Sequence, residues 1–356
     1  MSSILGKVNN MIHIDGSSGE GGGQILRTSL SLAAITGQEI TIENIRAKRD
    51  KPGLRPQHLT GALAVAEICG GELRGGAVGS MQLTMRAGEV KSGSYCFDVR
   101  KITSSAGAVS LILQTVLWPL VFAKDTSHIT FKGGTHVPFA PCSHYLSEVF
   151  LPVMASIGLK YKYRMLQAGY YPVGGGELHL QIDPVGTLQP IDLTNSVGKP
   201  VVEIVSAVSN LHLTIAERQL HQAITRCKDM KLGVTGNVME IQSPGKGTVL
   251  FIKSISGSAI AGFQSLGEVR KSAERVADDA CDELHAYIES GCAVDKHLAD
   301  QLIIPMALTN GFSKFSTCEI TQHLLTNIEV VKRFLPVRFK VNGELGGAGV
   351  VEKVDG

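Results

Sequence analysis

Two charged residues, Glu20 and Arg27, lie in a glycine-rich stretch that could bind an anion. Residues 15–30 read DGSSGEGGGQILRTSL, after a segment that alternates like a strand and before one with helical periodicity. Such a turn lets backbone N–H groups approach a phosphate at a helix N-terminus. The standard phosphate loops are absent, because Gly22 replaces the lysine of the Walker pattern and Gln24 replaces the last glycine of the dinucleotide pattern. A purely structural tight turn is the alternative.

The densest cationic segment of the chain follows at residues 46–58. Prolines and a glycine keep this segment irregular, so its charges are presented on a loop. Arginine suits the binding of phosphate through two parallel hydrogen bonds. A solvated run of charge is the alternative, but the loop follows the strand after the glycine-rich turn, so its arginines can gather near Glu20. The basic residues are Arg46, Lys48, Arg49, Lys51 and Arg55.

Two polar segments near the C-terminus also contain residues capable of chemistry. The first, HLADQ at residues 297–301, begins an expected helix, where Asp300 and Gln301 could simply be caps. The second, CEITQHLLTN at residues 318–327, places His323 where an expected strand gives way to a helix. A histidine at such a junction is commonly a cap or a packing residue, and a catalytic role is the alternative.

Hydrophobic periodicity and glycine punctuation predict the elements that position these residues. Residues 11–86 indicate the order strand, helix, strand, helix, strand, strand, and residues 94–182 repeat it. A third copy is expected over residues 296–354, although its first strand cannot be placed. Three βαβαββ units could pack around a common helical core. The expected elements are 11–15, 24–36, 39–45, 57–69, 72–74 and 81–86; 95–99, 106–122, 128–131, 143–157, 159–165 and 177–182; and 296–308, 314–320, 323–335, 337–341 and 350–354.

The segment between the second and third copies has a different character. After a polar segment at residues 192–199, we expect strands at 201–208, 238–242 and 248–254 and helices at 214–228 and 271–290. This pattern indicates a small α/β domain inserted into a larger one. We therefore predict an α/β (α+β) fold, with a large repeat domain formed by residues 1–187 and 293–356 and an inserted domain formed by residues 188–292.

The composition limits the class of protein. With 34 Lys and Arg against 32 Asp and Glu, the 356-residue chain has a net charge of +2. It therefore has no general positive field that would attract nucleic acid, although this net charge still allows a local basic site. The seven cysteines form no CxxC pair, which argues against a zinc site and a disulfide framework and favours a reducing compartment. Residues 1–10 lack a signal-peptide core, and no apolar run reaches the ~20 residues of a membrane span. We expect a soluble, cytoplasmic protein without membrane contact.

Eight motifs follow one another along the chain: DGxxGEGGGQILR (15–27), KPGL (51–54), QHL (57–59), GGT (133–135), YPxGGG (171–176), ADQ (299–301), HLLTN (323–327) and RFLP (333–336). Together they resemble the RNA 3′-terminal phosphate cyclase family, and they occur in family order from about residue 11 to residue 339. The resemblance implies three βαβαββ repeats with an inserted α/β domain. It also implies that the enzyme forms a histidine–AMP adduct from ATP, transfers AMP to an RNA 3′-phosphate, and releases AMP as the 2′-OH closes a 2′,3′-cyclic phosphate.

By this resemblance His323 is the nucleophile, and its neutral imidazole would carry AMP through a labile P–N bond. Mg²⁺ or Mn²⁺ is expected at Glu20 and Asp300, because carboxylates are hard ligands. Family members usually carry tyrosine where this chain has His297, so weaker stacking on adenine is expected. The ATP-binding positions implied are Gln114, Pro141, His297, Leu298, Ala299, Asp300, Gln301 and His323, and those expected near the phosphates or the RNA end are Arg27, Arg46, Arg49 and His58.

The implied partner is RNA with a 3′-phosphate end, whose single-stranded terminus needs only a small cationic pocket; a homodimer is compatible with the sequence. Two other functions stay open. A non-catalytic relative that acts in ribosome assembly would lose the nucleophilic histidine, which this chain retains. An enolpyruvyl-type transferase on a similar repeat scaffold would have no covalent histidine step, and the chain lacks the motifs expected for it.

Overall fold

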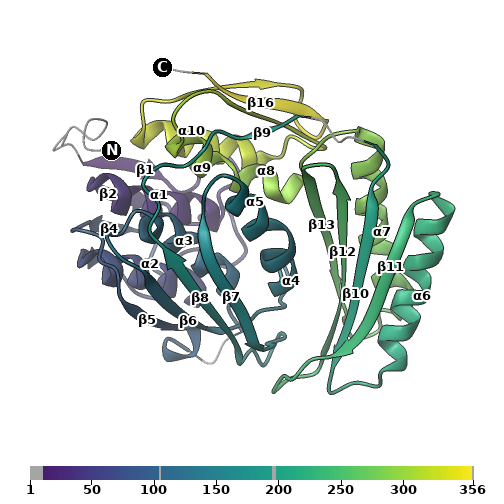
Figure 1. The fold of residues 1–356 in the computed structure, drawn as a ribbon. Coiled ribbons are helices and arrows are strands. Elements are labelled where there is room, and N and C mark those ends of the chain that lie inside the picture. Colours follow the sequence, from purple (N-terminus) through teal and green to yellow (C-terminus); the bar gives the residue numbers. More distant parts are fainter. Residues whose placement is uncertain (1–10, 104–105, 195–197, 355–356) are drawn as a thin grey trace.

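The computed structural model describes residues 11–103, 106–194 and 198–354. Three four-stranded sheets surround a group of helices, and a fourth sheet with two helices stands beside them (Figure 1). The predicted α/β (α+β) class with three βαβαββ repeats and an inserted domain is confirmed. The expectation about a signal peptide concerns residues 1–10, which lie outside the described residues, as do residues 195–197 of the polar segment.

The three sheets of the repeat domain share one topology. In each, the first strand pairs parallel with the second, the second pairs antiparallel with the last, and the last pairs antiparallel with the third. The parallel pairs require crossover helices, which cover one face of each sheet. The sheets are β1 (Ile12–Asp15), β2 (Glu39–Glu43), β4 (Leu83–Arg86), β3 (Glu72–Arg74); β5 (Ser94–Asp98), β6 (Ser127–Gly133), β8 (Gly176–Asp183), β7 (Lys160–Gln167); and β9 (Asp192–Leu193), β14 (Ser313–Thr317), β16 (Gly349–Val354), β15 (Arg338–Asn342).

The helices of the repeats meet in the middle, where α1 contacts α2, α3 and α10. Every residue of α3 except Gln114 is buried, which explains its nearly continuous apolar sequence. One hydrophobic core joins all three repeats. These helices are α1 (Gly23–Thr36), α2 (Pro56–Cys69), η1 (Val99–Lys101), α3 (Val109–Val121), α4 (Ser143–Tyr145), the π-helical turn η2 (Leu146–Phe150), α5 (Leu151–Ser156), α8 (Lys296–Gln301), α9 (Ile303–Leu308) and α10 (Gln322–Phe334).

Strand β9 supplies the first strand of the third repeat, which the sequence could not place. It is only two residues long and pairs with β14. Asp192 and Leu193 lie within the range 188–292 predicted for the inserted domain, so the strand pairing assigns them to the third sheet instead. The insertion thus interrupts the third repeat after its first strand. The remaining domain boundaries stay a prediction.

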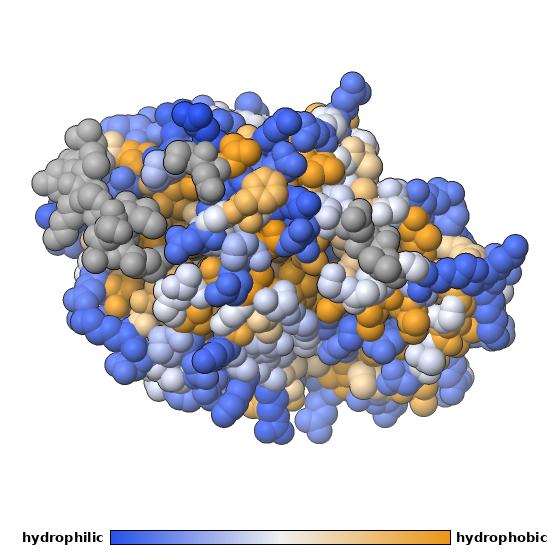
Figure 2. Space-filling view, turned by 45° about the horizontal axis from the view of Figure 1, so that its top comes forward, coloured by the Kyte–Doolittle hydropathy of each residue, from blue (hydrophilic) through white to orange (hydrophobic). Residues whose placement is uncertain are grey.

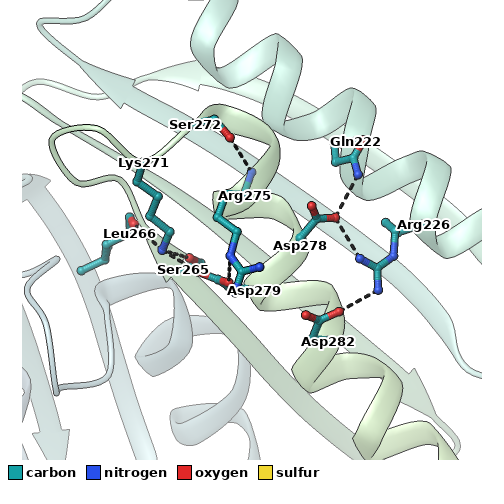
Figure 3. Close-up of polar contacts among 10 residues, drawn as sticks. All are labelled: Gln222, Arg226, Ser265, Leu266, Lys271, Ser272, Arg275, Asp278, Asp279 and Asp282. Atoms are coloured by element: carbon teal, nitrogen blue, oxygen red, sulfur yellow. Dashed lines mark hydrogen bonds and ion pairs between the residues drawn. The ribbon is translucent and has the colours of Figure 1, made fainter.

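The inserted domain is a sheet in the order β11-β10-β12-β13 with α6 and α7 packed on its outer face (Figure 1). Its buried core includes Val202, Ile252 and Leu284. Arg226 of α6 binds Asp278 and Asp282 of α7 at 2.8 and 2.7 Å (Figure 3), but such surface pairs contribute only about 0–1 kcal/mol each. The elements are β10 (Val201–Ser209), α6 (Thr214–Asp229), β11 (Gly233–Glu240), β12 (Gly247–Ser256), β13 (Ala259–Leu266) and α7 (Ala273–Ser290).

Three local expectations were wrong. Strand β13 was missed, because Gly262 interrupts its apolar pattern; this glycine packs against Tyr145 and Val149 of the repeat domain. The helix expected at 296–308 is two helices, α8 and α9, since Pro305 has no N–H for the carbonyl of Gln301. The helix expected at 143–157 is likewise divided, with Pro152 in the first turn of α5.

Three further features concern membrane-spanning helices, cysteines and the surface. Among the described residues no helix is long and apolar enough to cross a membrane. All seven cysteines lie in described segments and none forms a disulfide. Hydrophilic and hydrophobic residues are interspersed across the face in Figure 2, with hydrophilic side chains projecting at its edges.

Candidate active site

A cavity of about 580 Å³ gathers most of the residues that the sequence singled out. Its walls come from α1, α3, the segment before α4, α7, α8 and the start of α10. This volume suits a nucleotide-sized ligand. The predicted residues that line it are Arg27, Gln114, Pro141, His297, Asp300, Gln301 and His323.

His323 is the second residue of α10, and its side chain lines this cavity. The cap of the helix is Thr321, whose hydroxyl accepts the Leu324 N–H at 3.1 Å, so His323 itself is not needed as a cap. Its side chain is 49% exposed, and its Nε2 lies 3.6 Å from Oε1 of Glu20. Burial and the charges of Arg27 and Arg49 lower the pKa of His323, while Asp300 opposes them. A neutral imidazole therefore faces the cavity at neutral pH.

Glu20 lies in the turn between β1 and α1, where glycines make room for its carboxylate. A Cβ at Gly22 would overlap both carboxylate oxygens. Oε1 pairs with Arg49 of the basic loop, whereas Oε2 is buried and has no hydrogen-bond partner among the described residues. The Glu20 N–H donates to the Thr326 hydroxyl at 3.2 Å, which ties the turn to α10. The expectation that the basic loop reaches Glu20 is met by this contact.

Arg27 and Asp300 are opposite charges on facing walls. Arg27 donates to Gln24 Oε1 at 3.3 Å, and burial lowers its pKa to about 10, against the charge of Asp300. Burial raises the pKa of Asp300, while His323 and Arg27 act against that rise. Asn327 fixes this wall from behind, because its amide donates to the Asp300 carbonyl at 2.6 Å and its oxygen accepts from Thr28.

His58 and Arg46 lie outside the cavity lining. His58 Nδ1 accepts the Arg55 N–H at 3.2 Å at the start of α2, and Nε2 packs against Gly23. Burial, with Arg27, Arg46 and Arg55 nearby, lowers the pKa of His58 to about 3, so it is neutral at physiological pH. The guanidinium of Arg46 donates to the carbonyls of Lys51 and Gly53, which shapes the basic loop itself.

Another part of the cavity lining comes from α3 and α8. Gln114 donates to Gln301 Oε1 at 2.8 Å, and Gln301 donates to the His297 carbonyl. Burial alone would lower the pKa of His297, but Glu283 and Asp295 outweigh it and raise the pKa. Leu298 and Ala299 are completely buried in the core and do not line the cavity, so only their backbone could reach a ligand. The helix cap is Asp295, not Asp300 or Gln301.

Several cavity residues were not found from the sequence. Glu283 of α7 binds Lys296 at 2.8 Å and lies 3.6 Å from His297 Nε2; burial alone would raise its pKa, but His297 and Lys296 lower it to about 2. Phe139 is fully exposed beside Pro141, with a positive φ of 61°. The run Pro-Phe-Ala-Pro at 138–141 was a signal for an irregular loop, whereas nothing in the sequence links Glu283 to α8.

Two carboxylates of the site could hold a divalent cation. The orphaned Oε2 of Glu20 is an unused hard ligand, and Asp300 lies on the neighbouring wall beside His323. Oε1 pairs with Arg49, whereas Oε2 is buried against Gly22 and has no partner among the described residues. Glu20 and Asp300 are therefore the carboxylates of this region that could hold a Mg²⁺ or Mn²⁺ ion.

The comparisons with known proteins agree with one another. The family model for RNA 3′-terminal phosphate cyclase matches residues 18–341. The chain is 42% identical over 335 residues to the RNA 3′-terminal phosphate cyclase of Trichormus variabilis, covering 93% of this chain and 96% of that protein. The enzyme of the same name from Methylococcus capsulatus is 42% identical over 347 residues (96% and 96%), and that of Pyrobaculum neutrophilum is 40% identical over 352 residues (97% and 98%).

One solved structure also matches, that of the enolpyruvyl transferase NikO from Streptomyces tendae. The match covers 61% of this chain and 38% of the NikO chain, with a TM-score of 0.26 and 14% sequence identity. This likeness is too weak to carry an argument. The family match, by contrast, spans nearly the whole chain and includes the glycine-rich turn and the HLLTN segment. The chain therefore belongs to the RNA 3′-terminal phosphate cyclase family.

Proposed function

We propose that this protein is an ATP-dependent RNA 3′-phosphate cyclase that works through a covalent His323–AMP adduct. The observation that carries the proposal is the position of His323, half-exposed at the cavity with Glu20, Arg27 and Asp300 around it. The names of the relatives support the reaction type. The retained histidine is also the reason to prefer an enzyme over a non-catalytic relative.

The first step is attack by the neutral His323 imidazole on the α-phosphorus of ATP. A P–N bond forms as the bond to the β-phosphate oxygen breaks, and pyrophosphate leaves. The lowered pKa of His323 keeps its nucleophilic lone pair free at neutral pH. Arg27, which faces the same cavity, can stabilise negative charge that develops on the phosphate oxygens.

In the second step, an oxygen of the RNA 3′-phosphate attacks the phosphorus of the adduct, and the P–N bond to His323 breaks. The product carries a phosphoanhydride at the RNA end. In the third step, the neighbouring 2′-OH attacks the 3′-phosphorus, a 2′,3′-cyclic phosphate forms and AMP leaves. Activation is needed because the oxygens of a phosphomonoester are poor leaving groups, whereas AMP is a good one.

The part of the cavity lined by α3, α8 and Pro141 is assigned to the base and sugar of the nucleotide. Pro141 and His297 contribute rings to the cavity lining, while Gln114 and Gln301 supply amide groups. We assign His297 to stacking on adenine and the Gln114–Gln301 pair to polar contacts. Leu298 and Ala299 hold α8 in the core, so their role is support rather than contact.

Glu20 and Asp300 would hold the divalent cation. Bound there, Mg²⁺ or Mn²⁺ would neutralise charge on phosphate oxygens and so favour nucleophilic attack on the phosphorus. Arg49 and His58 lie on the glycine-rich side, where an RNA end would enter. His58 acts there as a neutral hydrogen-bonding group, because its pKa is about 3.

A direct assay uses a short RNA with a labelled 3′-phosphate, ATP and Mg²⁺ or Mn²⁺. The expected product resists phosphatase, forms only with ATP, and appears with an equal amount of AMP. The His323→Ala variant should make no product, and exposed His128→Ala should behave like the wild type. Cyclisation without ATP, or full activity of His323→Ala, would overturn the proposal.

A further inference from the structure

Three potential metal ligands outside the proposed catalytic residues converge behind the wall that carries Pro141. They are His136, which follows β6, Cys142, which precedes α4, and His144 within α4. One ligand atom from each lies within 4.8 Å of the other two. His136 and Cys142 are buried and His144 is partly buried. Nε2 of His136 and Nδ1 of His144 are 3.0 Å apart.

The backbone around these three residues is held by several contacts. The Ser143 N–H donates to the Thr135 carbonyl, and the His136 N–H donates to the Gly169 carbonyl, both at 3.0 Å. Gln264 of β13 accepts the Cys142 N–H at 2.7 Å and donates to the Ala140 carbonyl at 2.8 Å. Contacts from both domains therefore hold the three side chains in place, so little reorganisation would be needed to bind a metal ion.

The partner of the second ring nitrogen of His136 suits a metal site. Nδ1 of His136 lies 2.8 Å from the hydroxyl oxygen of Thr135, which also accepts the Gly169 N–H. A hydroxyl oxygen has two lone pairs, so it can accept from both N–H groups. With Nδ1 protonated, Nε2 is free to point at a cation, and such an outer hydrogen bond is typical of histidine ligands.

The donor atoms select the class of cation. One thiolate and two imidazoles suit Zn²⁺, whereas Mg²⁺ and Mn²⁺ prefer oxygen ligands. In a tetrahedral zinc site with Zn–N bonds of 2.0–2.1 Å, two nitrogens are about 3.3 Å apart. The observed separation of 3.0 Å needs to open by only a few tenths of an ångström.

We propose that His136, Cys142 and His144 form a zinc site that fixes the segment carrying Phe139, Ala140 and Pro141. The three protein ligands leave a fourth position for water. Because those three residues line the candidate nucleotide cavity, the bound ion would stabilise one of its walls. The sequence argued against a zinc site, since no CxxC pair is present; the ligand spacing here is His-x₅-Cys-x-His and depends on the fold.

Metal binding itself tests the proposal, independently of the cyclase reaction. The full-length protein, freed of metal by chelation, would be titrated with Co²⁺ in the presence of excess Mg²⁺, and Zn²⁺ would then be added. The wild type should take up about one Co²⁺ per chain with a thiolate charge-transfer band, which Zn²⁺ abolishes. Cys142→Ser should lose the band, and His144→Gln should weaken binding at least about tenfold.

Matched controls separate this cluster from other sites. Cys96→Ser replaces an exposed cysteine and His128→Gln an exposed histidine, so both should bind like the wild type. His323→Ala should also bind normally. The partly buried His144 makes His144→Gln informative even if Cys142→Ser folds poorly. Absence of stoichiometric Co²⁺ or Zn²⁺ binding, or undiminished binding in His144→Gln, would overturn the zinc site.

Discussion

At the scale of single residues, the protonation of His323 depends on a balance of charges. Burial, Arg27 and Arg49 lower its pKa, and Asp300 raises it. The proposed adenylation needs the unprotonated His323 ring. The rate of adenylation should therefore fall only when the pH drops through the pKa of His323, which lies below the ordinary value of 6.5. Above that pH, ionisation of His323 should have no further effect on the rate.

Replacing Arg49 with methionine should raise the pKa of His323. The substitution removes a nearby positive charge and also frees Glu20, whose negative charge favours the imidazolium. NMR titration of the His323 ring would measure the shift, and the acid limb of the adenylation rate should move to higher pH with it. Arg100→Met is the control, because Arg100 pairs with Asp98 elsewhere. An unchanged or lower His323 pKa would contradict this charge balance.

A second residue-scale prediction concerns His297, which we assign to stacking on adenine. A larger aromatic ring should stack better on adenine, and base–aromatic stacking contributes about 1–3 kcal/mol. His297→Tyr should therefore lower the KM for ATP about 3- to 10-fold with little change in kcat. Steady-state kinetics would measure it against the exposed control His128→Tyr. A KM that stays the same or rises would remove His297 from the stacking role.

At the scale of elements, the turn between β1 and α1 acts by placing one carboxylate. Gly22 lies against both oxygens of Glu20, and Gly23 lies against His58 and Arg27. The glycines therefore let neighbouring side chains approach the backbone closely, and they also allow the chain to turn. The proposed metal ligand depends on this packing.

Replacing Gly22 with alanine should disturb the site more than the fold. The added Cβ overlaps the Glu20 carboxylate, while the φ of −101° is acceptable for alanine. Because small misplacements of a catalytic group cost up to about 100-fold, adenylation should fall about 10- to 100-fold and need more metal. Single-turnover adenylation with a metal titration measures both. Exposed Gly186, with open space around it, gives the control Gly186→Ala; equal rates in both variants would contradict the role of the turn.

The sequence predicted long periodic elements better than short or interrupted ones. Helices such as α1 and α10 have apolar residues that recur with the helical period, so both were anticipated. Strand β9 has two residues and no pattern to detect, and Gly262 concealed β13. The sequence left Asp300 and Gln301 open as caps of α8, and the backbone shows that Asp295 accepts the N–H groups instead.

At the scale of the whole molecule, Asn327 joins the first repeat to the third. Its side chain bonds Thr28 of α1 and the carbonyl of Asp300 in α8, each at 2.6 Å, and it is almost completely buried. Asn327→Ala removes both hydrogen bonds and leaves the buried Thr28 hydroxyl without its acceptor, whereas the Asp300 carbonyl still accepts the Leu302 N–H, so the free energy of unfolding should fall by about 1–3 kcal/mol. Urea denaturation would measure it, with exposed Asn342→Ala as the control. Equal stability of the two variants would contradict this link.

The composition of the cavity shows where sequence reasoning ends. Motifs carried over from the family resemblance identified His323, Asp300 and Gln114 as site residues, and the fold brings them to one cavity. Glu283 comes from the inserted domain and reaches Lys296 only because α7 packs beside α8, a contact that no local pattern encodes. The cluster of His136, Cys142 and His144 is likewise a product of tertiary packing.

The central claim is that His323 carries AMP during the reaction. Incubation with α-labelled ATP and Mg²⁺ or Mn²⁺, without RNA, followed by peptide mapping, tests it most directly. A phosphoramidate is labile in acid and stable in alkali, so we expect a protein–AMP adduct with these properties on the peptide that contains His323. The adduct should vanish in His323→Ala and persist in His128→Ala. An adduct on another residue, or an undiminished adduct in His323→Ala, would contradict the account.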